Sequence, residues 1–98
     1  MDNNTRQEIL ALLKDCPNLP YLGMTVLPAS DYAVYQAKRA ALDAEDDPKY
    51  RQLYAAHLVK PMTSQEAVTK KFEILDEFQS KCDALMVGMI RDYCGEAN

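Results

Sequence analysis

The chain has 98 residues and a formal net charge of −4, with 48% hydrophobic and 27% charged residues. This composition excludes wholesale disorder, which needs low hydrophobicity together with high net charge. It also argues against nucleic-acid binding, because the nearest basic clusters are two isolated pairs, Lys38-Arg39 and Lys70-Lys71, and not a cationic stripe. We expect a single helical domain over residues 1–98.

The chain also lacks the features of membrane and secreted proteins. No apolar run reaches the roughly 18 residues of a membrane-spanning helix. Residues 1–4 lack the basic and apolar regions of a signal peptide. The three cysteines, Cys16, Cys82 and Cys94, are an odd number that fits a reducing compartment better than a disulfide framework. We therefore expect a cytoplasmic protein without membrane association.

The first helix is predicted to begin near Thr5 and to end by Cys16. Thr5 and Glu8 have the spacing of a capping box, and apolar residues follow at intervals of three and four. Pro17 disfavours helical geometry in the residue before it.

Residues 21–27 are the only strand candidate, because they are rich in large apolar and β-branched residues and end at Pro28. An unpaired strand would leave its backbone hydrogen-bonding groups unsatisfied. Two alternatives follow: an extended segment packed on helices, or an edge that pairs with another chain.

Two further helices are predicted over residues 29–44 and 48–59. Proline stands at the start of each, where its fixed backbone angle suits a helix. The acidic turn between them, residues 43–47, is interpreted as helix capping and favourable charge at a helix N-terminus. It lacks the alternating ligands and the terminal glutamate of a calcium loop.

The longest helix is predicted from Ser64 to Cys94. Thr63 and Glu66 form a second capping box, no proline interrupts the segment, and Gly95 is a natural stop. Thirty residues give roughly 45 Å of helix. The predicted fold class is therefore mainly α: a small bundle of about four helices with one long C-terminal helix and at most one short extended segment near residues 21–27.

An apolar ridge runs along this long helix. Side chains recur every seven residues in two series, Val68, Leu75, Cys82 and Met89, and Phe72, Gln79, Met86 and Tyr93. Each earlier helix spans about half of it, so either the short helices cover the ridge in tandem or part of it stays exposed. Exposed apolar stripes mark interaction sites. The predicted partner-binding residues are Phe72, Leu75, Phe78, Cys82, Met86, Met89 and Tyr93. Gly88 is expected to mark a bend or a close contact.

Residues with catalytic potential are scattered. His57 is the only histidine and has no neighbouring nucleophile, and adjacent carboxylates such as Asp76-Glu77 do not face each other on a helix. Phosphate-loop, metal-ligand and EF-hand patterns are missing from the sequence. The six tyrosines fit either a protein interface or a core edge with hydroxyls in water. We expect no enzyme, no catalytic residues, no metal and no cofactor.

The order of segments from Met24 to Cys94 resembles that of phage tail assembly chaperones. The matching features are a short strand candidate followed by the helix-opening phrase Leu27-Pro28-Ala29-Ser30-Asp31-Tyr32, the acidic turn Asp46-Asp47-Pro48 before a helix over residues 50–58, and a terminal helix. The resemblance implies a non-enzymatic protein that shields the long helical tape measure protein during tail assembly.

Three hypotheses for function follow. The first is an assembly chaperone or adaptor that binds another protein, helical in structure, with homo-oligomerisation through the same ridge as a further expectation. The alternative is a small acidic inhibitor that covers a basic or nucleic-acid-binding surface of a host enzyme. The third, a small helical enzyme, would depend on His57 or a cysteine.

Overall fold

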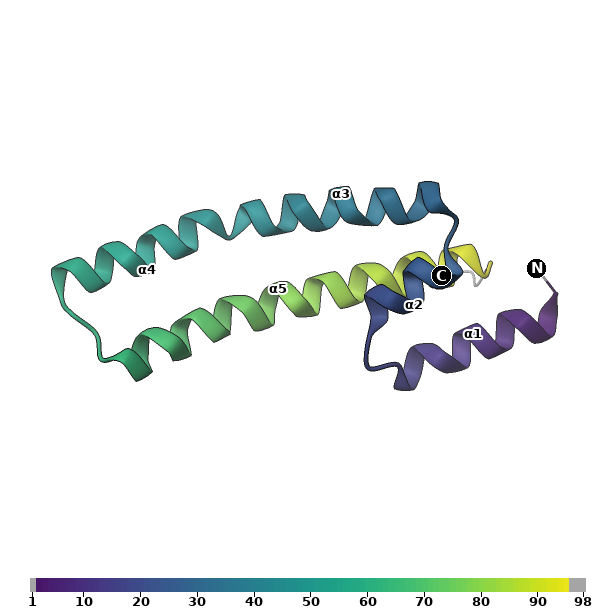
Figure 1. Cartoon of the computed structure of the whole chain (residues 1–98), viewed down its shortest axis with the longest axis horizontal. Helices are drawn as coiled ribbons and strands as arrows, with labels where there is room; N and C mark the ends of the chain where they lie inside the picture. The colour runs from purple at the N-terminus through teal and green to yellow at the C-terminus, as the bar shows by residue number, and fades with distance from the viewer. Residues whose placement is uncertain (1, 96–98) are drawn as a thin grey trace. The chain divides into compact units, whose positions relative to one another are not determined.

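The computed structural model describes residues 2–95, and every regular element in that range is a helix (Figure 1). The helices are α1 (Asn3–Asp15), α2 (Leu19–Val26), α3 (Ala29–Glu45), α4 (Asp47–Val59) and α5 (Ser64–Tyr93). This confirms the mainly α fold class with one long C-terminal helix.

Helix α1 begins earlier than the sequence predicts. Asp2 is the N-cap: its Oδ1 accepts a hydrogen bond from the Thr5 backbone N–H at 2.7 Å, and its Oδ2 accepts one from the Thr5 hydroxyl at 3.1 Å. The prediction that Thr5 itself caps the helix is therefore wrong, because Asp2 is the N-cap and Thr5 lies inside the first turn. The end at Asp15, just before Cys16, agrees with the prediction.

Helix α2 occupies the segment that the sequence predicts to be extended, so both alternatives for residues 21–27 are wrong. The Asn18 side chain accepts a hydrogen bond from the Tyr21 backbone N–H at 3.2 Å, and Pro20 lies in the first turn. These are helix-start features. They outweigh the β-branched composition because the helix buries Leu22 against the core.

Helices α3 and α4 are separated by a single residue, Asp46, whose backbone is itself in the right-handed helical region. The Asp46 N–H donates to the Asp43 carbonyl at 3.1 Å, and the Tyr50 N–H donates to the Asp46 carbonyl at 3.1 Å. Most of the predicted acidic turn is therefore helix.

Helix α5 has the predicted ends. The Thr63 hydroxyl oxygen accepts a hydrogen bond from the Glu66 N–H at 3.1 Å. Gly95 follows the last turn with a φ of +74°, a left-handed conformation that favours glycine. Gly88 makes no close contact, because a side chain built there meets open space. The expectation of a close contact at Gly88 is wrong.

The internal contacts divide the chain into two compact units, which we describe separately. Within the described residues, unit 1 contains residues 2–38 and 83–95, and unit 2 contains residues 39–82. Helices α3 and α5 each continue from one unit into the other.

Unit 1 has a closed apolar core. Its buried members are Leu22, Leu27, Tyr35, Met86, Ile90 and Cys94, and side chains of α1 pack against them. At Gly23 the α2 backbone approaches α5 so closely that an added Cβ would overlap the Met86 thioether. A larger residue at position 23 would therefore force the buried Met86 side chain to move.

Unit 2 contains the end of α3 together with a helix pair in which α4 lies alongside the first half of α5 (Figure 1). Its buried residues are Leu53, Cys82 and Asp46. The Arg39 guanidinium lies 5.7 Å from the Phe78 ring centroid, and the Lys71 ammonium lies 5.1 Å from that of Tyr54. Cation–π contacts thus cover some of the aromatic surface that a larger core would bury.

Candidate protein-binding surface

The seven predicted partner-binding residues do not share one environment. Cys82 and Met86 are 1% and 0% exposed. A partner cannot reach them in this structure, so the prediction that they belong to an accessible ridge is wrong. Met86 belongs to the unit 1 core, where α2 approaches it at Gly23. Met89 is half-buried against the unit 1 core, whereas Tyr93 is exposed at the end of α5.

The other predicted residues lie in unit 2. Phe72 and Leu75 are 56% and 46% exposed, which is unusual for large apolar side chains at regular helical spacing. Phe78 is half-buried, and its ring carries the Arg39 guanidinium. Of the predicted ridge in unit 2, the part before Phe78 is therefore accessible.

Further exposed apolar residues lie in unit 2 outside the predicted set. Val68 lies one turn before Phe72 on α5, and Tyr54 and Leu58 lie one turn apart on α4. Leu58 is 84% exposed. The sequence indicated such exposure, because the apolar positions of α5 form a stripe too wide for contact with a single neighbouring helix.

Lys71 connects the two sets of exposed side chains. It contacts the Tyr54 ring on α4, and on α5 it stands three residues after Val68 and four before Leu75. Residues three and four apart are neighbours on a helix surface. Tyr54 and the exposed residues of α5 therefore lie on one side of unit 2, and Leu58 continues this side one turn after Tyr54, whereas the exposed Val59 is not part of this set. We name this surface the open face and define it as Tyr54, Leu58, Val68, Phe72 and Leu75.

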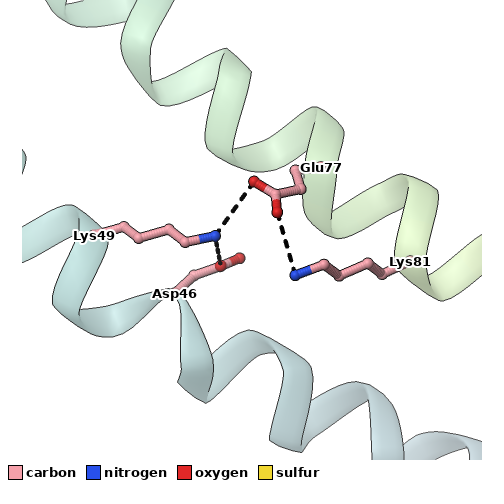
Figure 2. Close-up of polar contacts among 4 residues, drawn as sticks. All are labelled: Asp46, Lys49, Glu77 and Lys81. Carbon is pink, nitrogen blue, oxygen red and sulfur yellow. Dashed lines mark hydrogen bonds and ion pairs between the residues drawn. The ribbon is translucent and has the colours of Figure 1, made fainter.

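An ion-pair cluster bridges α4 and α5 (Figure 2). The Lys49 ammonium lies 3.2 Å from Asp46 Oδ1 and 3.3 Å from Glu77 Oε2, and the Lys81 ammonium lies 3.3 Å from Glu77 Oε1. The hydrogen bond to Asp46, and then that to Glu77, raises the pKa of Lys49. Hydrogen bonds from Lys81 and then Lys49 lower the pKa of Glu77. Each charged form is stabilised by its partners.

The acidic turn is therefore only partly available to a binding partner. Asp46 is buried and paired with Lys49, whereas Asp43, Glu45 and Asp47 are exposed. This agrees with a structural role for at least one of the four carboxylates.

His57 has a structural contact. Its Nδ1 accepts a hydrogen bond at 2.9 Å from the Met62 backbone N–H, which closes the connection between α4 and α5. The contact engages the nitrogen that a general base would otherwise use. Among residues 2–95, no three His, Cys, Asp or Glu side chains cluster closely enough to hold a metal ion. Within the same range no helix is both long and apolar enough to cross a bilayer.

Comparison of the chain with family models, with curated proteins and with solved structures gives no match. The resemblance to phage tail assembly chaperones thus stays a prediction.

Proposed function

We propose that this chain is a non-enzymatic protein–protein interaction module whose open face binds an amphipathic helix of another protein. The observation that carries the proposal is the contrast within unit 2 between few buried apolar residues and five large exposed ones on one side. A soluble protein seldom leaves such a surface free without a binding role.

The size of the open face supports this role. Each of its two aromatic side chains has roughly 150–250 Å² of surface. With the three aliphatic side chains added and all five partly exposed, the open face presents apolar surface on the order of 500 Å². A stable interface buries about 800 Å² on each partner, of which the centre is apolar and the rim polar. The open face is large enough for such a centre.

The helical nature of the partner follows from the geometry of a helix pair. Two packed helices leave a shallow groove along each side of their contact, and a third helix with an apolar stripe fills it by ridge-into-groove packing. The exposed residues on α5 have the spacing of such a stripe. An assembly chaperone or adaptor of the phage type would use this mode to shield a helical segment of its client.

The alternative of a small acidic inhibitor has weaker support. It requires the acidic turn to face a basic target, yet Asp46 is buried in an ion pair with Lys49. Charge reversal at Asp46 would disturb folding, so a test of this alternative should use Glu45→Lys and Asp47→Lys.

The test compares two substitutions at equal exposure. Leu75 on the open face and Val34 on α3 in unit 1 are both 46% exposed within helices. Affinity purification from the source cells with quantitative mass spectrometry should recover a partner with wild type and Val34→Asp but not with Leu75→Asp. Circular dichroism should show equal helicity in all three. Equal recovery with Leu75→Asp would refute the proposal.

Sedimentation distinguishes the nature of the occupant. A wild-type dimer that Leu75→Asp converts to a monomer would identify the occupant as a second copy of the chain. A protein that stays monomeric at high concentration would indicate that the occupant of the open face is a different protein.

A further inference from the structure

A groove in unit 1, separate from the open face, is lined by three cations. Its volume is about 370 Å³, and its walls are Arg6, Gln7, Leu10, Ala11, Lys14 and Arg91. Five of these residues lie on α1, and Arg91 comes from the last turn of α5. The volume lies at the lower end of the range for small-ligand sites.

The charge of the groove contrasts with that of the chain. The net charge of the protein is −4, yet no acidic side chain lines the groove. Within residues 2–95, the ion pairs are those of Lys49 and Lys81, and no carboxylate forms a close ion pair with Arg6, Lys14 or Arg91.

Helix dipoles explain two of these cations but not the third. Lys14 and Arg91 lie in the last turns of α1 and α5, where positive charge is favourable. Arg6 lies near the start of α1, where a cation is unfavourable. Its guanidinium is nevertheless held by a hydrogen bond to Asn3 Oδ1 at 2.5 Å. The Asp2 carboxylate, four residues earlier at the N-cap of the same helix, offsets part of this unfavourable effect.

The donors approach the groove from two helices. Arg6 and Lys14 stand eight residues apart on α1, on one face and about 12 Å along the axis. Arg91 comes from α5. A planar carboxylate accepts hydrogen bonds mainly in its own plane, whereas tetrahedral phosphates accept them from several directions. The two arginines add a fork geometry that suits the oxygens of phosphate and carboxylate groups alike.

We propose that this groove binds a small multivalent anion of the phosphate type, with Arg6, Lys14 and Arg91 as its ligands. Gln7 supplies a further amide donor, and Leu10 and Ala11 form the apolar part of the wall. This site is independent of the proposed helix-binding function, because its residues lie in unit 1 and the open face lies in unit 2.

The test uses inorganic pyrophosphate as the probe and the whole chain as the receptor. Isothermal titration at low salt should give saturable one-to-one binding that weakens as salt is raised. Arg91→Gln and Lys14→Gln should each weaken binding roughly tenfold, the loss expected for a hydrogen bond to a charged group. The matched control is Arg51→Gln on α4, which makes the same change in charge outside the groove and should bind as wild type.

Three results would overturn the proposal. The first is an absence of saturable pyrophosphate binding. The second is an equal loss of affinity in Arg51→Gln, which would mean general charge attraction. The third is citrate binding at least as tight as pyrophosphate binding, which would refute the phosphate assignment. Because Lys14 and Arg91 are both exposed, their variants should keep wild-type helicity, which circular dichroism checks. Amide NMR shifts upon titration should concentrate at residues 6–14 and near residue 91.

Discussion

Two positions on the same helix show how the two units differ. Phe72 in unit 2 and Met86 in unit 1 are two heptads apart on α5, so they occupy the same position of the seven-residue repeat. Phe72 is more than half exposed, and Met86 is completely buried. The repeat specifies which side of the helix is apolar. Burial depends on the other helices, since α1 and α2 add cover in unit 1 that unit 2 lacks.

The largest expected effect is the difference in the free energy of unfolding between substitutions at these two positions. Met86→Ala should lower the free energy of unfolding by about 2–5 kcal/mol, because it removes buried contacts and leaves a cavity. Phe72→Ala should cost far less, since its ring is largely in water already. Urea denaturation followed by circular dichroism measures both. Equal losses at the two sites would mean that Phe72 is buried in solution, either within the chain or in an oligomer.

A pair of glycines gives the next largest effect. Gly23→Ala should destabilise the protein by roughly 1–3 kcal/mol, because the added methyl group displaces the buried Met86 side chain. Gly88→Ala should instead stabilise it by up to about 1 kcal/mol, since its methyl group meets open space and alanine favours helix. Thermal unfolding measures both shifts. A stabilising Gly23→Ala would show that the Met86 side chain moves aside at little cost.

The α5 N-cap tests whether the helix pair of unit 2 depends on local signals. Thr63→Ala should cost about 1 kcal/mol, because it removes the acceptor for the Glu66 amide. Thr69→Ala, at an exposed position within α5, is the matched control and should be neutral or slightly stabilising. Hydrogen exchange should show the loss of protection confined to the first turns of α5. Equal effects of the two substitutions would contradict the capping role.

Most helix boundaries could be predicted from local signals. Pro17, Pro28 and Gly95 mark ends or starts, and the Thr63 cap fixes the beginning of α5. These signals act within one turn of the chain, so a sequence reveals them directly.

Tertiary contacts explain what the sequence could not reveal. Residues 21–27 have strand-like composition, but packing of Leu22 in the unit 1 core and capping by Asn18 make them helical. In the same way the sequence identifies the α5 ridge but not its cover. Cys82 and Met86 looked as accessible as Phe72, because coverage by distant helices leaves no mark within the ridge itself.

The smallest expected effect on stability comes from the ion pairs between α4 and α5. Because the pKa of Glu77 is lowered in the folded state, its contribution to stability is present above the ordinary value of 4.5 and is lost as the pH falls through the lower folded pKa. The pKa of Lys49 is raised, so its contribution is present below 10.5 and is lost as the pH rises through the higher folded pKa.

Glu77→Gln should therefore be less stable than wild type at neutral pH, and the difference should shrink in acid below pH 4.5 and at high salt. The control is Glu73→Gln, an exposed carboxylate on the same helix that forms no ion pair within the described residues. Denaturant unfolding across pH measures both. Since the cluster is exposed apart from Asp46, solvent keeps its contribution small. A large effect at neutral pH would mean that these charges, and not apolar contacts, hold the helix pair of unit 2 together.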